Sequence, residues 1–143
     1  MAGVLYAVFA GLLISVQSVF NARVSEKVGF WITNALVHGS GFVVALLIFW
    51  FVRDGSLARL HSVNKLYLLG GAMGVMIVFT VMKSILSLGS GYGVAVILIV
   101  QLLAAILIDS LGLFGAPKLP FTFNKLIGLA IMIAGVVVYK LKG

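Results

Sequence analysis

The chain contains no cysteine, two prolines and three acidic residues in a length of 143. Without cysteine there is neither a disulfide framework nor a thiolate metal site. Charged residues make up 9% of the sequence and apolar residues 63%, whereas a soluble domain has about a quarter and about a half. The composition therefore excludes an ordinary soluble domain and indicates an integral membrane protein.

The few charges are mostly of one sign, and the net charge is +7. A basic balance of this size is also found in nucleic-acid-binding proteins, which carry a basic stripe or a patch interleaved with aromatic residues. Here the basic residues stand singly between apolar stretches. We therefore expect anionic lipid headgroups as their partners, and no nucleic acid.

Five long apolar stretches predict an all-α integral membrane fold with one domain over residues 1–143. The first stretch lacks a basic leader and an Ala-x-Ala cleavage signal, so it is interpreted as a retained span. We expect polar turns at residues 21–27 and 89–93, and a break at Pro117 and Pro120. The transmembrane helices are predicted at about residues 3–21, 30–52, 66–83, 92–114 and 124–141.

The basic residues divide equally between the two ends of these helices. With five spans, the N-terminus and the second and fourth loops share one side of the membrane, called side A, and the other loops and the C-terminus share side B. Side A carries Arg53, Arg59, Lys65, Lys118 and Lys125, and side B carries Arg23, Lys27, Lys83, Lys140 and Lys142. Because an excess of basic residues decides which side stays in the cytoplasm, the tie predicts dual topology and an antiparallel homodimer of ten helices, an inverted repeat of the kind found in secondary transporters. The alternative is that a weak bias fixes one orientation.

Polar side chains within the spans are the candidate site residues. Gln17 and Asn21 share one face of the first predicted helix, and Asn34, His38 and Gly41 share one face of the second. These positions lie nearer side B, whereas Asp109 lies toward side A. In an inverted pair the partner's Asp109 would reach the depth of this cluster. We predict that a shared cavity binds substrate through Gln17, Asn21, Asn34, His38 and Gln101, with Asp109 as the proton-coupling candidate, because a carboxylate within a span marks a pathway or a fixed partner.

Each of these residues also has a structural interpretation. The amides would then be hydrogen-bond partners between helices, and His38 would be neutral and bonded to a neighbouring carbonyl group. Asp109 would pair with Lys118 or Lys125. No nucleophile and base, and no metal-ligand cluster, are found at useful spacing, so we expect no enzyme activity, no metal and no cofactor.

Glycines form a second group of candidates. Gly70 and Gly74 in the third stretch, and Gly128 and Gly135 in the fifth, are predicted to let helices pack closely. Gly89, Gly91 and Gly93 either form a tight turn or leave backbone N–H groups open to an anion at a helix start.

Several spaced motifs together resemble the YdcZ family of inner-membrane exporters in the drug/metabolite transporter superfamily. They are Gly11-x5-Gln17-x3-Asn21, Leu69-Gly-Gly-x-x-Gly74, Gln101, Asp109-x-x-Gly112-x-x-Gly115-x-Pro117-x-x-Pro120, and the run from Lys125 through Gly128 to Gly135. The resemblance implies a five-helix half-transporter of the bacterial inner membrane that works as an antiparallel dimer.

The sequence thus predicts a multi-pass inner-membrane protein that exports a small metabolite or drug-like solute by alternating access. Its expected partners are an inverted second copy, a small-molecule substrate and the lipid bilayer. Two alternatives are a small dual-topology ion channel and a membrane assembly subunit that transports nothing.

Overall fold

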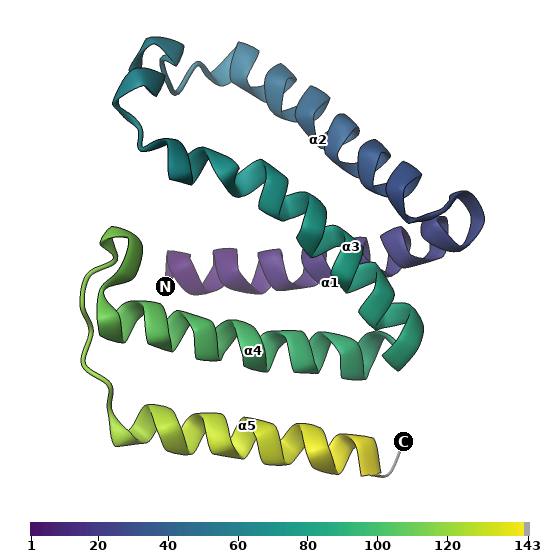
Figure 1. Cartoon of the computed structure of the whole chain (residues 1–143), viewed down its shortest axis with the longest axis vertical. Helices are drawn as coiled ribbons and strands as arrows, with labels where there is room; N and C mark the ends of the chain where they lie inside the picture. The colour runs from purple at the N-terminus through teal and green to yellow at the C-terminus, as the bar shows by residue number, and fades with distance from the viewer. Residues whose placement is uncertain (142–143) are drawn as a thin grey trace. The chain divides into compact units, whose positions relative to one another are not determined.

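The structure is a computed structural model that describes residues 1–141, so the predicted side-B residue Lys142 lies outside the described part. The described chain is all helical and contains no strand. Five long helices are apolar enough to cross a membrane (Figure 1). They are α1 (Ala2–Val28), α2 (Phe30–Val52), α3 (Gly70–Leu88), α4 (Ser90–Leu111) and α5 (Phe123–Leu141).

Two compact units make up the chain, one over Met1–Leu86 and a second from Ser87 onward. The first unit contains α1, α2 and nearly all of α3, and the second contains α4 and α5. Short 3-10 helices interrupt the connections: η1 (Leu57–Ser62) and η2 (Lys65–Leu69) before α3, and η3 (Leu113–Gly115) after α4.

The polar turn expected at residues 21–27 is wrong, because α1 continues through this segment to Val28. Its uncharged residues Asn21, Ala22 and Ser25 instead form a buried face with Ser18. The charged residues Arg23, Glu26 and Lys27 are exposed. Small side chains let neighbouring helices approach closely, and a continued helix keeps the backbone hydrogen-bonded at the membrane edge. The hydroxyl groups of Ser18 and Ser25 donate to carbonyl groups of α1 itself, at 2.6 and 2.7 Å. These serines therefore serve as small packing residues.

A single glycine separates α1 from α2. Gly29 has φ 87° and ψ 159°, a conformation that is essentially restricted to glycine. Gly89 separates α3 from α4 with nearly the same angles, φ 81° and ψ 159°. The five-residue turn expected at 89–93 is therefore reduced to one residue, and Gly91 and Gly93 belong to α4.

The fourth predicted span, at about residues 92–114, corresponds to α4 over Ser90–Leu111. Gly112 takes the left-handed conformation, with φ 66°, and ends α4 at Leu111. Beyond it, the backbone N–H of Leu119 donates to the carbonyl oxygen of Asp109 at 2.9 Å. This bond folds the proline-containing connection back on the end of α4.

Aromatic side chains join α2 to α3 near side B. Trp31 stacks on Phe79 with 4.9 Å between ring centroids, and Phe30 meets the same ring edge-on at 5.6 Å. The Lys83 ammonium lies 4.4 Å from the centroid of Phe30, a cation–π contact. We call Phe30, Trp31, Phe79 and Lys83 the aromatic clamp.

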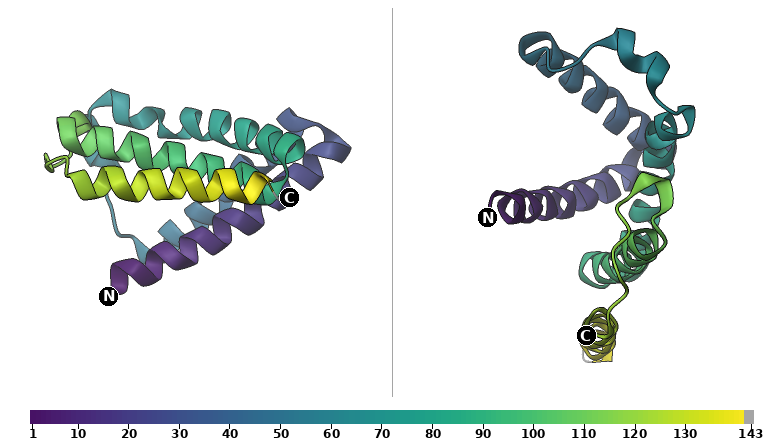
Figure 2. Two further views of the ribbon diagram at one scale, coloured as in Figure 1. Left: turned by 90° about the horizontal axis from the view of Figure 1, so that it is seen from below. Right: turned by 90° about the vertical axis from the view of Figure 1, so that its left-hand side faces the viewer.

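In the second unit, α4 and α5 run antiparallel and side by side in Figure 1 and in the left view of Figure 2. Gly93 and Leu129 are the buried residues of these two helices. Lys140 extends over the ring of Tyr92, with its ammonium 4.4 Å from the centroid. This contact holds the end of α5 against the start of α4.

Candidate functional site

A shallow groove between α1 and α2 contains two of the predicted site residues. Its volume is about 450 Å³, and its lining consists of Gln17, Asn21, Val37, Ser40, Gly41, Val44, Ala45 and Ile48. Gln17 and Asn21 lie one helical turn apart on α1, as their spacing predicts. Neither amide forms a hydrogen bond with any described residue, although Asn21 is only 9% exposed.

Asn34 and His38 lie against α3 and do not line this groove. Asn34 is 2% exposed, and its Nδ2 donates to the carbonyl oxygen of Val75 at 2.7 Å. Its Oδ1 is fully buried and has no hydrogen-bond partner among the described residues. An amide oxygen buried in this way costs about 1–3 kcal/mol.

His38 bonds to its own helix and faces a glycine of α3. Its Nδ1 is 3.0 Å from the carbonyl oxygen of Asn34. Because a carbonyl group only accepts, Nδ1 is assigned the proton in the neutral ring and Nε2 keeps its lone pair. A Cβ added to Gly74 would lie 3.0 Å from this Nε2, so the glycine makes room for the ring.

The predicted face of α2 is thus divided within one chain. Asn34 and His38 face α3, whereas Gly41 lines the groove toward α1. The structure brings together Gln17 with Asn21, and Asn34 with His38, as two separate polar pairs.

Gln101 and Asp109 belong to the second unit. Gln101 is exposed on α4, and Asp109 is half-buried near the end of that helix. Neither side chain has a hydrogen bond or an ion pair with residues 1–141. Within the described chain Asp109 pairs with neither Lys118 nor Lys125. Lys125 donates to the carbonyl oxygen of Pro120 at 3.1 Å.

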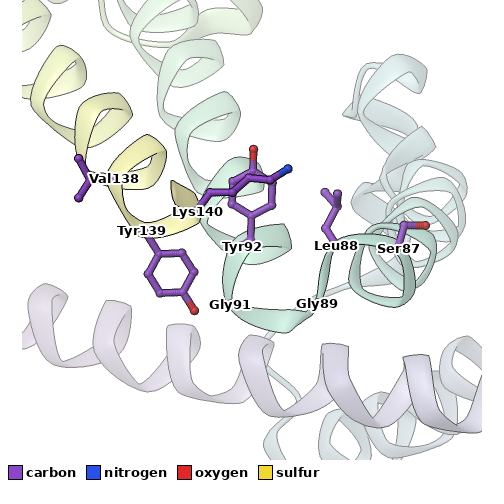
Figure 3. A pocket seen from close by; sticks show the side chains of 8 residues that line it. All are labelled: Ser87, Leu88, Gly89, Gly91, Tyr92, Val138, Tyr139 and Lys140. Atoms are coloured by element: carbon purple, nitrogen blue, oxygen red, sulfur yellow. The ribbon is translucent and has the colours of Figure 1, made fainter. Parts of the chain in front are cut away.

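A larger pocket of about 770 Å³ lies at the start of α4 and the end of α5. Figure 3 shows its lining residues, with Lys140 over Tyr92 and the Tyr139 ring beside Gly91. A Cβ at Gly91 would collide with the Tyr139 hydroxyl group, which accounts for the glycine. Sequence reasoning missed the two tyrosines; their positions at matching ends of consecutive spans are the signal that could have revealed them.

Of the glycines predicted to pack helices, only Gly74 meets another side chain within the described chain. A Cβ at Gly70, Gly128 or Gly135 would have nothing within 4 Å. Residues 1–141 also contain no group of three or more His, Cys, Asp or Glu side chains able to hold a metal ion.

Five membrane-spanning helices with uncharged polar side chains along them suit a protein that moves a solute, and a comparison with protein families gives the same answer. A family model described as "Putative inner membrane exporter, YdcZ" matches residues 2–138. The chain belongs to the YdcZ family. A search of curated proteins and a search of solved structures found no match.

Membership of the YdcZ family confirms the resemblance carried by the spaced motifs. Together with the five helices, it makes the chain a multi-pass inner-membrane protein. The description of the family model as an exporter implies a transporter rather than an enzyme.

Proposed function

We propose that this YdcZ protein exports a small metabolite or drug-like solute by alternating access, as a dimer of two copies inserted in opposite orientations. The equal division of ten basic residues between the two membrane surfaces carries this proposal. The structure has five helices able to span the membrane. Successive loops therefore lie on alternate sides, which places five of the basic residues on side A and five on side B. With no charge excess on either side, insertion has no preferred direction.

The exposure of the helices supports a partner within the membrane. At most 11% of the most apolar window of any spanning helix is buried inside the chain. Most residues in these windows are therefore not buried and can pack against lipid or against another helix. Fully lipid-facing amides are unfavourable, which favours a second copy beside the unpaired polar groups.

Inversion brings complementary groups to one depth. In the proposed dimer, the partner's Asp109 lies level with Gln17, Asn34 and His38, and Gln101 from both copies lies near the midplane. Substrate would bind in the cavity formed by these amides, with Asp109 exchanging the coupling proton. The aromatic clamp would close the side-B end of α2 and α3, while the long connection between these helices leaves their side-A ends free to separate.

The orientation test uses a reporter at the C-terminus that is active on only one side of the membrane, together with a second reporter active on the other. We expect both to be active in comparable amounts. A single cysteine at either end of α4 tests the pairing, since an antiparallel pair brings opposite ends together. Cross-links should form in cells that produce a side-A and a side-B cysteine variant together. Cross-links confined to identical ends, or a C-terminus found on one side only, would reject the dimer.

Transport is tested in proteoliposomes. Saturable uptake and counterflow are expected of a carrier, whereas a linear flux that ignores the pH gradient would indicate the channel. If replacing Gln101 and Asp109 with Leu and Asn leaves the cellular phenotype unchanged, the chain is an assembly subunit and does not transport.

A further inference from the structure

We infer that the α1–α2 groove binds a neutral solute whose polar head both donates and accepts hydrogen bonds, such as a carboxamide, with an apolar tail attached. This inference rests on the proposed export function, because it names the class of solute that the exporter takes. It is carried by two amide side chains that the fold leaves without partners.

The first observation is the unpaired state of Asn21. Its side chain is 9% exposed, lines the groove, and forms no hydrogen bond with any described residue. Other buried polar residues on the neighbouring helix faces do have partners: the hydroxyl groups of Ser18, Ser25 and Thr33 each donate to a backbone carbonyl of α1 or of the α1–α2 joint, Gly29. The only fully buried side-chain atom without a partner in residues 1–141 is Asn34 Oδ1, so the unpaired amide atoms of Asn21 reach the groove surface, where a bound ligand can pair with them.

The second observation is the chemical character of the lining. Gln17 places another unpaired amide one helical turn from Asn21, so the groove offers two carbonyl acceptors and two NH₂ donors. Ser40 adds a hydroxyl oxygen that is still free to accept, since its proton goes to the Val37 carbonyl at 3.2 Å. A head with both a donor and an acceptor satisfies this set.

The third observation concerns charge. None of the eight lining residues is ionisable. Placing an ammonium or a carboxylate beside uncharged amides within a bilayer would leave the ion without a counter-charge, which is strongly unfavourable. The groove residues themselves therefore disfavour organic cations and anions of the same shape. The partner's Asp109, level with Gln17 in the proposed dimer, is the proton-coupling group and is not part of this lining.

The apolar part of the groove lining explains why the proposed solute carries an apolar tail. Val37, Val44, Ala45 and Ile48 form an apolar surface on α2 beside the amides. The groove volume of about 450 Å³ falls in the range of small-molecule sites. The ligand is thus polar at the end that meets α1 and apolar along α2.

The test uses four probes of matched chain length that differ only in the head: hexanamide, hexanoate, hexylammonium and heptan-2-one. Binding to the purified full-length protein is measured by titration calorimetry and by the shift in unfolding temperature. We expect hexanamide to bind most tightly. The ketone, which only accepts, should bind about tenfold more weakly for each hydrogen bond lost, and neither ion should bind.

Three variants locate the site. Gln17→Leu and Asn21→Leu should each weaken hexanamide binding about tenfold. Gln17 is exposed, so its variant keeps the test valid if Asn21→Leu fails to fold. Thr80→Val is the matched control: Thr80 lies on α3, and its hydroxyl donates to carbonyl groups of its own helix, so hexanamide binding should not change.

Preferential binding of hexylammonium or hexanoate would overturn the inference, as would hexanamide binding that survives both α1 variants. A third result would also overturn the inference: hexanamide does not bind, and Asn21→Leu loses the dimer. The amides would then belong to the interface between copies. Failure of the exporter proposal is distinguishable from failure of this inference. In that case hexanamide binds at the groove, but no counterflow is seen in proteoliposomes.

Discussion

At the residue scale, Asn34 is the residue of the described chain with a fully buried side-chain atom that has no partner. Its bond to the Val75 carbonyl at 2.7 Å stabilises the fold by about 1 kcal/mol, whereas its buried, unpaired Oδ1 costs about 1–3 kcal/mol. The net effect on stability is therefore between zero and a cost of about 2 kcal/mol. Stability alone therefore does not explain an asparagine at this position, which suits the proposed role in transport.

Asn34→Leu should accordingly leave the free energy of unfolding unchanged or raise it by up to about 2 kcal/mol, while transport falls. Chemical unfolding in detergent micelles and counterflow in proteoliposomes measure the two quantities. A loss of several kcal/mol would mean that the Val75 bond dominates and that Asn34 is a structural residue.

Gly74 is the second residue whose role the structure defines. A methyl group there would lie 3.0 Å from His38 Nε2, so the imidazole has to shift. We expect Gly74→Ala to destabilise the protein by about 1 kcal/mol, as moderate overpacking does.

Two comparisons check the cause. Gly70→Ala should not destabilise, because nothing lies within 4 Å of the added carbon. Combining Gly74→Ala with His38→Ala should remove the penalty. If the penalty persists in the double variant, the clash with His38 is not its source.

At the element scale, single glycines decide where the helices end. Gly29, at φ 87° and ψ 159°, occupies a region that other residues reach only at a cost of about 1–3 kcal/mol. No atom crowds this position, so backbone strain is the whole effect of a substitution.

Gly29→Ala should therefore lower the free energy of unfolding by about 1–3 kcal/mol. Gly39→Ala, at a helical and equally uncrowded position of α2, should raise it by about 0.5–1 kcal/mol through helix propensity. Thermal unfolding of both variants in one detergent makes the comparison. Equal effects of the two changes would contradict the assigned strain.

The helices also show which parts of the fold can be predicted from the sequence. Length and hydropathy predict five helices, and the second span at 30–52 matches α2. The helical spacing of Gln17 and Asn21 is enough to place both in one groove. The polar residues at 21–27 predict a turn, but α1 continues through them to Val28. Asn21 and Ser25 are buried against a neighbouring helix, which polarity alone does not reveal.

Other features depend on how helices cross, which periodicity does not specify. Asn34, His38 and Gly41 share a helix face by their spacing. In the structure Asn34 and His38 contact α3, whereas Gly41 lines the groove between α1 and α2. The contact between Tyr139 and Gly91 likewise joins residues far apart in the sequence.

At the scale of the whole molecule, the balance of basic residues makes orientation sensitive to a single charge. Lys27→Gln removes a cation from side B and should send the C-terminus mainly to the periplasmic side, whereas Lys118→Gln removes one from side A and should keep it mainly in the cytoplasm. The two-reporter assay at the C-terminus measures both. Shifts in the same direction, or none, would contradict dual topology.

The two connections between helices of the first unit differ greatly in length. One residue links α1 to α2, whereas residues 53–69 link α2 to α3 through two short 3-10 helices. The one-residue link keeps the amides of α1 beside the apolar wall of α2 as the two sides of one groove. In the proposed transport cycle, the longer connection would let the side-A end of α3 move while α1 and α2 keep the solute between them.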